Sequence, residues 1–224
     1  TKPYNVGFAT NQLHHFMPVR VVSDGKYKYM RSYIPYKQFA LRNYYQWGMP
    51  SNQVWDSLKI NGLINNNIWK QPYLHRQYEM LFDLRKDPYE LNNIACDTLY
   101  KNKLKELRQV LVSHINTTND LGFFIPSFRK GINLFKLVHD ENYPLNELQA
   151  IVDLAGNPFS EDVKFIIDNL KSNDPNMRFW GAVAMAQLGI TDRYHDCPPE
   201  LIALLHDEDA YVAAEAAYAC AYLG

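Results

Sequence analysis

The sequence lacks a long apolar run, a strong net charge and a leader pattern. None of its hydrophobic runs reaches the ~20 residues that a helix needs to cross a bilayer, so no membrane span is predicted. The formal net charge of -1 supplies no basic field, and no nucleic-acid partner is predicted. The chain starts at Thr1 without a secretory signal pattern, which indicates a mature chain or an excised piece.

Cysteine is also scarce, with residues at positions 96, 197 and 220 only. An odd number cannot complete a disulfide framework, so cysteine usage leaves the cellular compartment open. None of the cysteines has the Cys-x-x-Cys spacing of a zinc site. We therefore predict that Cys96, Cys197 and Cys220 are buried, unreactive thiols.

The residues that are present suit a globular protein with a buried core. Hydrophobic residues make up 47% of the 224 residues and charged residues 21%, which predicts one or two domains. Residues 18–23 and 26–33 predict two strands joined at Asp24-Gly25, a pair suited to positive φ. Residues 11–16, before them, are expected to form a polar loop.

A third strand and a helix follow. Residues 78–85 alternate, with Met80, Phe82 and Leu84 on one side, and the strand is expected to stop at Asp87-Pro88 because proline has no donor for a ladder. Residues 98–116 predict an amphipathic helix packed across the sheet. The expected class is α+β, with a small antiparallel sheet and a packed helix.

Three segments together resemble the C-terminal region of the sulfatases. Residues 81–84 and 87–95 read LFDL and DPYELNNIA, which is similar to a late signature of that family. Residues 21–31 resemble its Val-Arg-Asp-Gly-Arg-Tyr-Lys-Tyr-Ile-Arg hairpin, and residues 118–126 resemble the end of that region in bacterial members. Taken without the resemblance, residues 78–95 read as an ordinary strand and turn.

The resemblance implies a parent enzyme that hydrolyses sulfate esters, including those of sulfated glycans. Sulfatases make a formylglycine nucleophile from a Cys/Ser-x-Pro/Ala-x-Arg motif and hold a calcium ion, and this chain has no such motif. Cys197-Pro198 is followed by Pro199 and Glu200 but not by the arginine. We therefore expect no catalytic residue and no metal site here. The nucleophile and the calcium would belong to an upstream catalytic domain of the same polypeptide.

The resemblance also implies side chains at the edge of a substrate cleft. Histidine and arginine suit a sulfated, anionic ligand. The candidate substrate-binding residues are His14, His15, Arg20, Arg31 and Tyr33. The alternative is that the histidines are a solvated loop pair and that the other three are ordinary strand residues.

After Pro126 the sequence predicts short helices and a repeat. Residues 170–189 align with residues 205–224 at an offset of 35 residues, and Gly189 is expected to end the first copy. The alternation of alanines and the Asp174-Pro175 start resemble HEAT repeats, which form α-solenoids. The second copy departs from the pattern, with Ala213 in place of the arginine.

The predicted domains are therefore 1–128, the sulfatase-like α+β subdomain, and 129–224, the HEAT-like helical domain. The first hypothesis is a sulfatase C-terminal portion that is inactive alone, in a periplasmic, secreted or lysosome-like compartment. The second is a non-enzymatic module whose α-solenoid surface docks a protein partner. The upstream motif distinguishes the two hypotheses.

Overall fold

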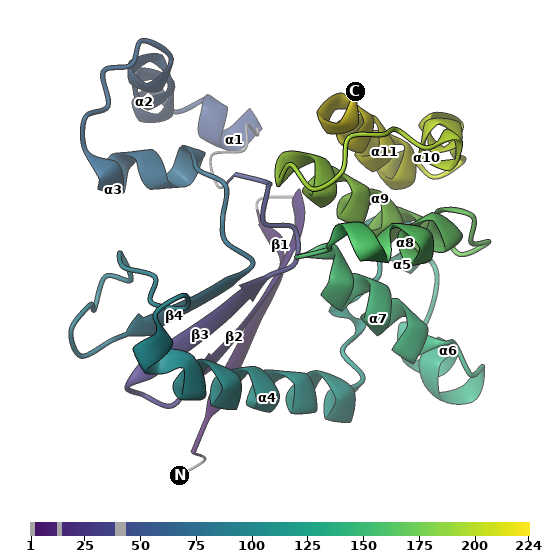
Figure 1. Cartoon of the computed structure of the whole chain (residues 1–224), viewed down its shortest axis with the longest axis horizontal. Coiled ribbons are helices and arrows are strands. Elements are labelled where there is room, and N and C mark those ends of the chain that lie inside the picture. The colour runs from purple at the N-terminus through teal and green to yellow at the C-terminus, as the bar shows by residue number, and fades with distance from the viewer. Residues whose placement is uncertain (1–2, 13–14, 39–43) are drawn as a thin grey trace. The chain divides into compact units, whose positions relative to one another are not determined.

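The computed structural model describes residues 3–12, 15–38 and 44–224 (Figure 1). The chain forms two compact units, Thr1–Leu111 and Val112–Gly224, and each is described by itself. The boundary lies within one helix, whereas the expected domain boundary after residue 128 stays a prediction. In the part of the chain that the structure describes, no helix is both long and apolar enough to cross a membrane.

The N-terminal unit is built on a four-stranded antiparallel sheet in the order β1-β2-β3-β4. The strands are β1 (Asn5–Gln12), β2 (His15–Ser23), β3 (Tyr27–Ser32) and β4 (Glu79–Asp83). The antiparallel sheet and its packed helix confirm the predicted α+β class. Figure 1 shows β3 and β4 side by side although about fifty residues separate them in the chain.

The turn between β2 and β3 forms for the predicted reason. The Asp24 carboxylate accepts hydrogen bonds from the backbone N–H groups of Lys26 and Tyr27, at 2.9 and 2.7 Å, and Gly25 has φ of +84°. Without a Cβ, glycine adopts this left-handed conformation without strain.

The predicted polar loop over residues 11–16 is wrong. The β1–β2 ladder continues through the pairs Asn11↔Phe16 and Gln12↔His15, because a shift in register after Ala9 lets pairing resume beyond it. His15 therefore opens β2, and His14 lies outside the described residues.

One face of the sheet, called the α4 face, is covered by the helix that follows β4. Register places Arg20, Arg31 and Glu79 in one row on this face, with Tyr29 in the next row. Helix α4 (Lys101–Thr118) follows a short 3-10 helix, η2 (Thr98–Tyr100). Its buried residues include Leu104, Leu107 and Leu111, which confirms the predicted apolar stripe.

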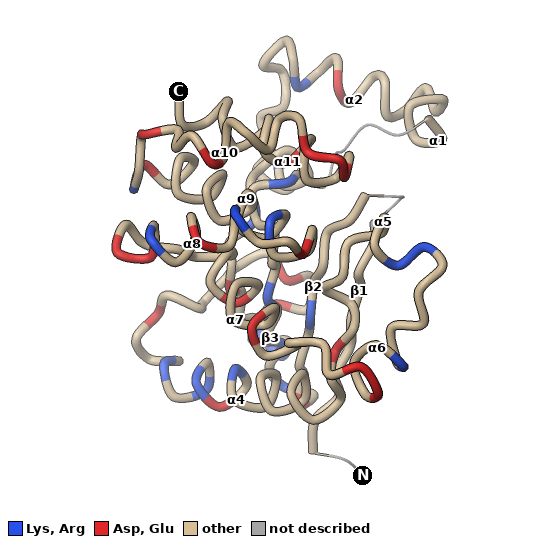
Figure 2. Tube along the Cα trace, turned by 90° about the vertical axis from the view of Figure 1, so that its right-hand side faces the viewer, with Lys and Arg blue, Asp and Glu red and all other residues tan. Residues whose placement is uncertain are grey.

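The charged residues of α4 are mainly basic, with Glu106 as its acidic residue (Figure 2). Lys103 binds Asp24 of the β-turn at 3.2 Å, and Arg108 binds Glu79 of β4 at 2.6 Å. These pairs join the polar edges of α4 to the sheet that its leucines cover.

Short helices fill the connection between β3 and β4. They are α1 (Tyr44–Trp47), α2 (Pro50–Ile60), α3 (Asn67–Lys70) and η1 (Gln71–Tyr73). The Trp55 indole N–H donates to the carbonyl oxygen of Trp69 at 3.2 Å, and its ring meets that of Tyr73 edge-on. This aromatic contact holds α2 beside α3 and η1.

The C-terminal unit is helical throughout. Its helices are η3 (Leu121–Phe123), α5 (Pro126–Arg129), α6 (Leu134–Asp140), α7 (Leu145–Ala155), η4 (Ser160–Asp162), α8 (Val163–Leu170), α9 (Pro175–Ile190), α10 (Pro199–Ala203), η5 (Leu204–His206) and α11 (Ala210–Leu223). Helix α9 is buried along most of its length and packs against α7, α8 and α11. The Trp180 indole N–H donates to the Phe123 carbonyl oxygen at 2.9 Å and anchors α9 to the start of the unit.

Two successive helix pairs, α8–α9 and α10–α11, reflect the 35-residue repeat. Asp174 caps α9 by accepting a hydrogen bond from the Asn176 N–H, and Asp209 caps α11 by accepting one from the Tyr211 N–H. Gly189, however, does not end α9, which continues to Ile190. A Cβ at Gly189 would lie 2.8 Å from the Tyr222 carbonyl oxygen, so glycine serves here for close packing against α11.

The prediction of buried cysteines is wrong for Cys96, which is exposed. Cys197 and Cys220 are half-buried, and their sulfur atoms lie 3.2 Å apart. Residues 23 positions apart in the chain therefore form a thiol pair that the cysteine spacing did not indicate.

Candidate functional site

The predicted substrate-binding residues come mainly from β2 and β3. Arg20 and Arg31 are directly paired across these strands, and both are buried. The Arg31 guanidinium lies 5.9 Å from the centre of the Tyr33 ring, so three of the five predicted residues form one cluster on the α4 face. His15, at the start of β2, is half-buried, and none of the described residues hydrogen-bonds its Nε2. The structure does not describe His14.

Arg20 is held by the backbone of its own sheet. Its Nη1 donates to the carbonyl oxygens of Val19 and Ala9, at 2.9 and 3.2 Å. The guanidinium carbon lies 5.8 Å from the centre of the Phe8 ring, whose own face is largely exposed. The side chain is 1% exposed, so it contributes to the packing of the sheet whatever else it binds.

Arg31 belongs to a network centred on Glu79. The Tyr29 hydroxyl donates to Glu79 Oε1, and Arg108 donates two hydrogen bonds to the same carboxylate, at 2.7 and 2.6 Å. Arg31 Nε donates to the Tyr29 hydroxyl at 3.0 Å. This network fixes the position of Arg31 beside the rings of Tyr33 and Tyr78.

The electrostatics of this network favour the charged form of Glu79. Burial by itself raises the pKa of Glu79, but the hydrogen bonds from Arg108 and Tyr29, with the charge of Arg31, outweigh it and hold the pKa below its ordinary value. Burial also raises the pKa of Tyr29, so its hydroxyl stays a donor to Glu79.

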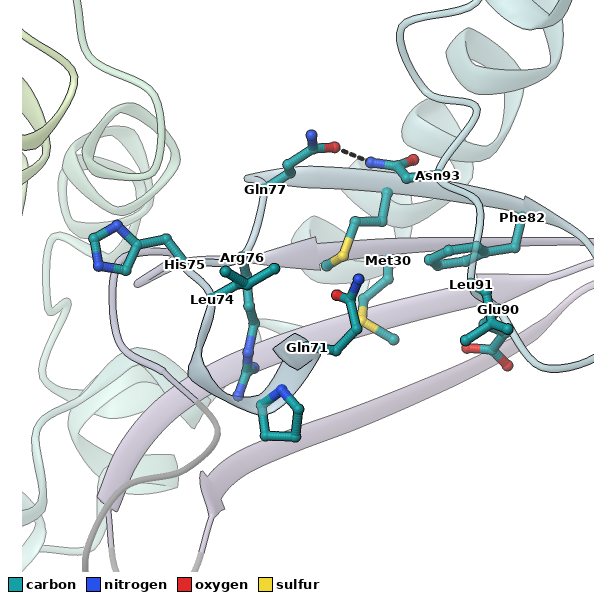
Figure 3. Close-up of a pocket in the computed structure, with 12 residues that line it drawn as sticks. Met30, Gln71, Leu74, His75, Arg76, Gln77, Phe82, Glu90, Leu91 and Asn93 are labelled. Atoms are coloured by element: carbon teal, nitrogen blue, oxygen red, sulfur yellow. Dashed lines mark hydrogen bonds between the residues drawn. The ribbon is translucent and has the colours of Figure 1, made fainter. Parts of the chain in front are cut away.

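The opposite face of the sheet carries a pocket of about 410 Å³ (Figure 3). Its floor is Met30, Met80 and Phe82, and Met30 and Met80 are direct partners across β3 and β4. These residues alternate with the Glu79 network along the same strands, so the period of two separates the two faces. We call this surface the pocket face.

Two irregular segments form the walls of the pocket. Residues 71–77 supply Gln71, Pro72, Leu74, His75, Arg76 and Gln77, and the turn after β4 supplies Glu90, Leu91 and Asn93. The Arg76 N–H donates to the Pro35 carbonyl oxygen at 2.8 Å, which places the first wall beside the end of β3.

The second wall is held by side chains that satisfy backbone groups. The Asn93 side chain accepts a hydrogen bond from the Leu81 N–H at 2.8 Å and donates to the Gln77 side-chain oxygen. Asp87 accepts from the Leu91 and Asn92 N–H groups, at 3.0 and 2.8 Å, and so holds the turn that follows β4. Both walls are therefore fixed to the sheet.

Charged side chains lie at two ends of the pocket (Figure 3). Burial lowers the pKa of Arg76 to about 10. Glu90 sits in the left-handed region with φ of +56°, and its carboxylate binds the Lys28 ammonium at 2.7 Å. A non-glycine residue in this conformation carries strain of about 1 kcal/mol or more, which the Lys28 ion pair offsets.

Sequence reasoning missed the pocket residues at positions 71–77. They belong to a stretch without periodicity, and no local pattern indicated which sheet face they would cover. The one available signal was the run His75-Arg76-Gln77 directly before a strand, which is polar and potentially cationic at a sheet edge.

Comparison with known proteins relates this chain to one class of enzyme. No protein-family model matches it. A search of curated proteins found 34% identity over 102 residues with an ulvan-active sulfatase from Formosa agariphila. The similarity is to a sulfatase. It covers 46% of this chain but only 17% of that protein, so the chain spans a small part of its relative.

Calcium is a cofactor of the sulfatase family, and the described residues can be tested for a calcium site. Among residues 3–12, 15–38 and 44–224, no group of three or more His, Cys, Asp or Glu side chains could hold a metal ion. Calcium needs several oxygen ligands converging on one point, and the carboxylates of Glu79, Glu90 and Asp87 are instead bonded to arginine, lysine and backbone N–H groups. The residues described do not fit that ion.

Proposed function

We propose that this chain is the C-terminal portion of a sulfatase that hydrolyses sulfate esters of glycans. The similarity over 102 residues to a sulfatase carries this proposal. The nucleophile and calcium belong to the upstream catalytic domain, and this portion completes the substrate cleft. A relation to sulfatases also suits an extracellular or periplasmic location.

The contribution of this chain to the cleft would be binding and not bond cleavage. A guanidinium offers a planar pair of donors that fits a sulfate group. Arg20 and Arg31, with Tyr33 beside them, would present such donors, and His15 at the start of β2 would extend the set. His14, which lies outside the described residues, remains a candidate from the sequence alone. Their fixed positions lower the entropy lost when an anion binds.

The test uses the intact parent protein and measures sulfate release from a sulfated polysaccharide. Tyr33→Phe removes one hydroxyl without removing the ring, and we expect a higher KM with a similar melting temperature. Arg20→Lys keeps the positive charge but removes the planar pair of donors, and we expect it to raise KM as well. Because Arg20 is buried, Arg20→Ala would also disturb folding and is the poorer test.

The isolated 224-residue chain is the second arm of the test. It should release no sulfate from any ester, whereas the parent should. A parent whose upstream region lacks the Cys/Ser-x-Pro/Ala-x-Arg motif, and which releases no sulfate, would overturn the proposal.

The helix pairs support a second proposal, a protein-binding role of HEAT-like repeats. The last pair presents partly exposed apolar side chains, Ile202, Leu205, Tyr211 and Tyr222. The partner would be the upstream domain of the same polypeptide. Co-sedimentation of this chain with that domain, weakened by Tyr211→Glu, would support the role, and sedimentation unchanged by Tyr211→Glu would remove this surface.

A further inference from the structure

The floor of the pocket on the pocket face suits the apolar side of a sugar ring. The thioethers of Met30 and Met80 and the ring of Phe82 form a continuous apolar surface. Binding pockets combine such a surface with a few polar groups that fix orientation. The volume of about 410 Å³ is enough for a single sugar unit and its substituents.

Amide side chains supply the polar groups of the pocket. Figure 3 shows the Gln71 side chain lying over Met30, within the pocket. A glutamine amide offers both donors and an acceptor, which matches a pair of sugar hydroxyls. Asn93 donates to the oxygen of Gln77, which orients the Gln77 amide and leaves its NH₂ group as a donor.

The charge at one end of the pocket selects for an anion. Arg76 lines the pocket and is half-buried, so its guanidinium is already partly stripped of water. A guanidinium in such a position binds carboxylate or sulfate more strongly than one in bulk water. At the other end the Glu90 carboxylate lines the pocket and repels an anion, so the anionic group of a ligand would lie toward Arg76.

We propose that this pocket binds an anionic sugar unit, with Arg76 holding a carboxylate or sulfate and Gln71 and Gln77 bonding hydroxyls. It would serve as a subsite for a non-reacting unit of the glycan, on the sheet face opposite Arg20 and Arg31. This inference rests on the proposed function. Its test therefore measures sugar binding in the pocket independently of sulfate release.

The experiment observes methionine methyl groups by NMR in the full 224-residue chain. Met30 and Met80 report on the pocket, whereas Met177 and Met185 are buried in α9 and serve as internal controls. The probes are D-glucose 6-sulfate, D-glucuronic acid and D-glucose. We expect the methyl signals of Met30 and Met80 to shift with one or both anionic sugars and only weakly with glucose. The anionic sugar that causes the larger shift at equal concentration identifies whether the pocket prefers carboxylate or sulfate.

Variants assign the selectivity to a residue. Arg76→Gln should weaken binding of the anionic sugars by about tenfold or more and leave glucose unchanged. Lys105→Gln removes the same charge from an exposed position of α4 and should change nothing. Gln71→Ala leaves Arg76 in place and should weaken the binding of all three sugars. It provides a second test of the pocket if Arg76→Gln fails to fold.

Two results would overturn the subsite. The Met30 and Met80 signals could stay unmoved by every sugar, or the shifts could be equal for charged and neutral sugars and indifferent to Arg76→Gln. Unmoved signals in a chain whose parent releases sulfate would reject the subsite alone. Selective shifts in a chain whose parent releases no sulfate would reject the proposed function alone.

A second inference comes from the thiol pair of the C-terminal unit. Cys197 precedes α10 and Cys220 lies in α11, and their sulfur atoms are 3.2 Å apart. We infer that this pair forms a disulfide when the chain meets a disulfide oxidant, as in an extracellular or periplasmic setting. The bond would fasten the loop before α10 to α11.

The oxidation is a two-step exchange with a reagent R–S–S–R such as oxidised glutathione. The Cys197 thiolate attacks one sulfur, forming a mixed disulfide and releasing R–S⁻. Cys220 then loses its proton and attacks the Cys197 sulfur, forming the new bond and releasing the second R–S⁻. Two protein thiols are oxidised and one reagent disulfide is reduced to two thiols. Burial raises the pKa of Cys220 to about 11, which favours Cys197 as the first to react.

The test is a thiol count with peptide mapping before and after treatment with oxidised glutathione. We expect a linked Cys197–Cys220 peptide and no glutathione on either of these residues, whereas the exposed Cys96 either stays free or carries one glutathione. Cys96→Ser should keep the link and Cys220→Ser should abolish it. Three remaining thiols, or glutathione on both Cys197 and Cys220 with no linked peptide, would overturn the inference.

Discussion

At the scale of single residues, Glu79 is the centre of the polar network on the α4 face. Strand β4 is short, and its alternation puts Glu79 on the covered side of the sheet. A buried carboxylate is costly unless it is paired and hydrogen-bonded, and Arg108 and Tyr29 meet that requirement. The same network holds Arg31 in place.

Replacing Glu79 by glutamine should make folding less dependent on acid pH. The pKa of Glu79 in the folded chain lies below its ordinary value of 4.5, so its stabilisation is complete above about pH 4.5 and is lost as the pH falls through the folded pKa. Glu79→Gln should therefore cost about 2 kcal/mol at pH 7 and progressively less on acidification. Urea unfolding between pH 7 and pH 3 measures this.

The matched control is Glu161→Gln, which changes an exposed carboxylate. Its unfolding curves should follow the parent chain at every pH. A constant difference between Glu79→Gln and the parent chain across the pH range would mean that the cost is loss of packing and not of charge.

At the scale of elements, α9 and α11 approach each other through a glycine. The sequence pattern predicted Gly189 as a helix end, yet its backbone is helical and its missing side chain makes room for Tyr222 and Leu223. Small residues permit close helix packing, and α9 and α11 make the most extensive contact between helices of this unit.

Gly189→Ala should destabilise the C-terminal unit by about 2 kcal/mol despite the better helix propensity of alanine. The new Cβ would meet backbone, the Tyr222 carbonyl oxygen, at 2.8 Å. Gly181→Ala in the same helix is the control. Its Cβ would meet the Leu170 side chain at 3.0 Å and the Leu170 backbone nitrogen at the more ordinary distance of 3.4 Å, so we expect a much smaller loss. Thermal unfolding of both variants compares them. Equal losses would show that the spacing of α9 and α11 is not set at Gly189.

At the scale of the whole molecule, the two units have separate stabilising contacts. In the C-terminal unit Arg178 binds Asp207 through two hydrogen bonds, at 2.7 and 2.9 Å, and the carbonyl oxygens of Ser172 and Asn173. This joins the loops before α9 and α11, the equivalent positions of the two helix pairs. Both partners are nearly buried.

Arg178→Met should raise amide hydrogen exchange in α8 to α11 and leave β1 to β4 unchanged. It leaves the Asp207 carboxylate buried without its partner, at a cost of about 3 kcal/mol. Lys171→Met breaks an exposed pair with Glu200 and should cost under about 1 kcal/mol. Faster exchange in the β1–β4 sheet of Arg178→Met would show that the units unfold together.

Local patterns predicted much of the fold and little of the pocket. The Asp24-Gly25 turn, the leucine stripe of α4 and the aspartate caps of α9 and α11 depend on neighbours in the chain, so sequence was enough. The helices α5 and α6 were not predicted, because α5 is a single turn and α6 is only seven residues long.

The candidate binding residues divide in the same way. Arg20 and Arg31 lie on the adjoining strands of a predicted hairpin, and Tyr33 directly follows the second strand, so pairing and period-two alternation bring them together. The role of those side chains remains a prediction. Arg76 and Gln71 join Met30 and Met80 only because residues 71–77 fold back over β3 and β4, and no pattern in that segment fixes its path.

The strands, the main helices and the resemblance to sulfatases could be predicted from sequence, because each depends on residue type at short spacing. Long-range packing, in contrast, pairs Glu79 with Arg108, opens a pocket on the sheet face opposite Arg31 and brings Cys197 next to Cys220. Glu79 and Arg108 are 29 positions apart in the chain, Cys197 and Cys220 are 23 apart, and the pocket is lined by residues from Met30 to Asn93. The formation of these contacts depends on how whole faces pack, which minimises exposed apolar area and which no short pattern records.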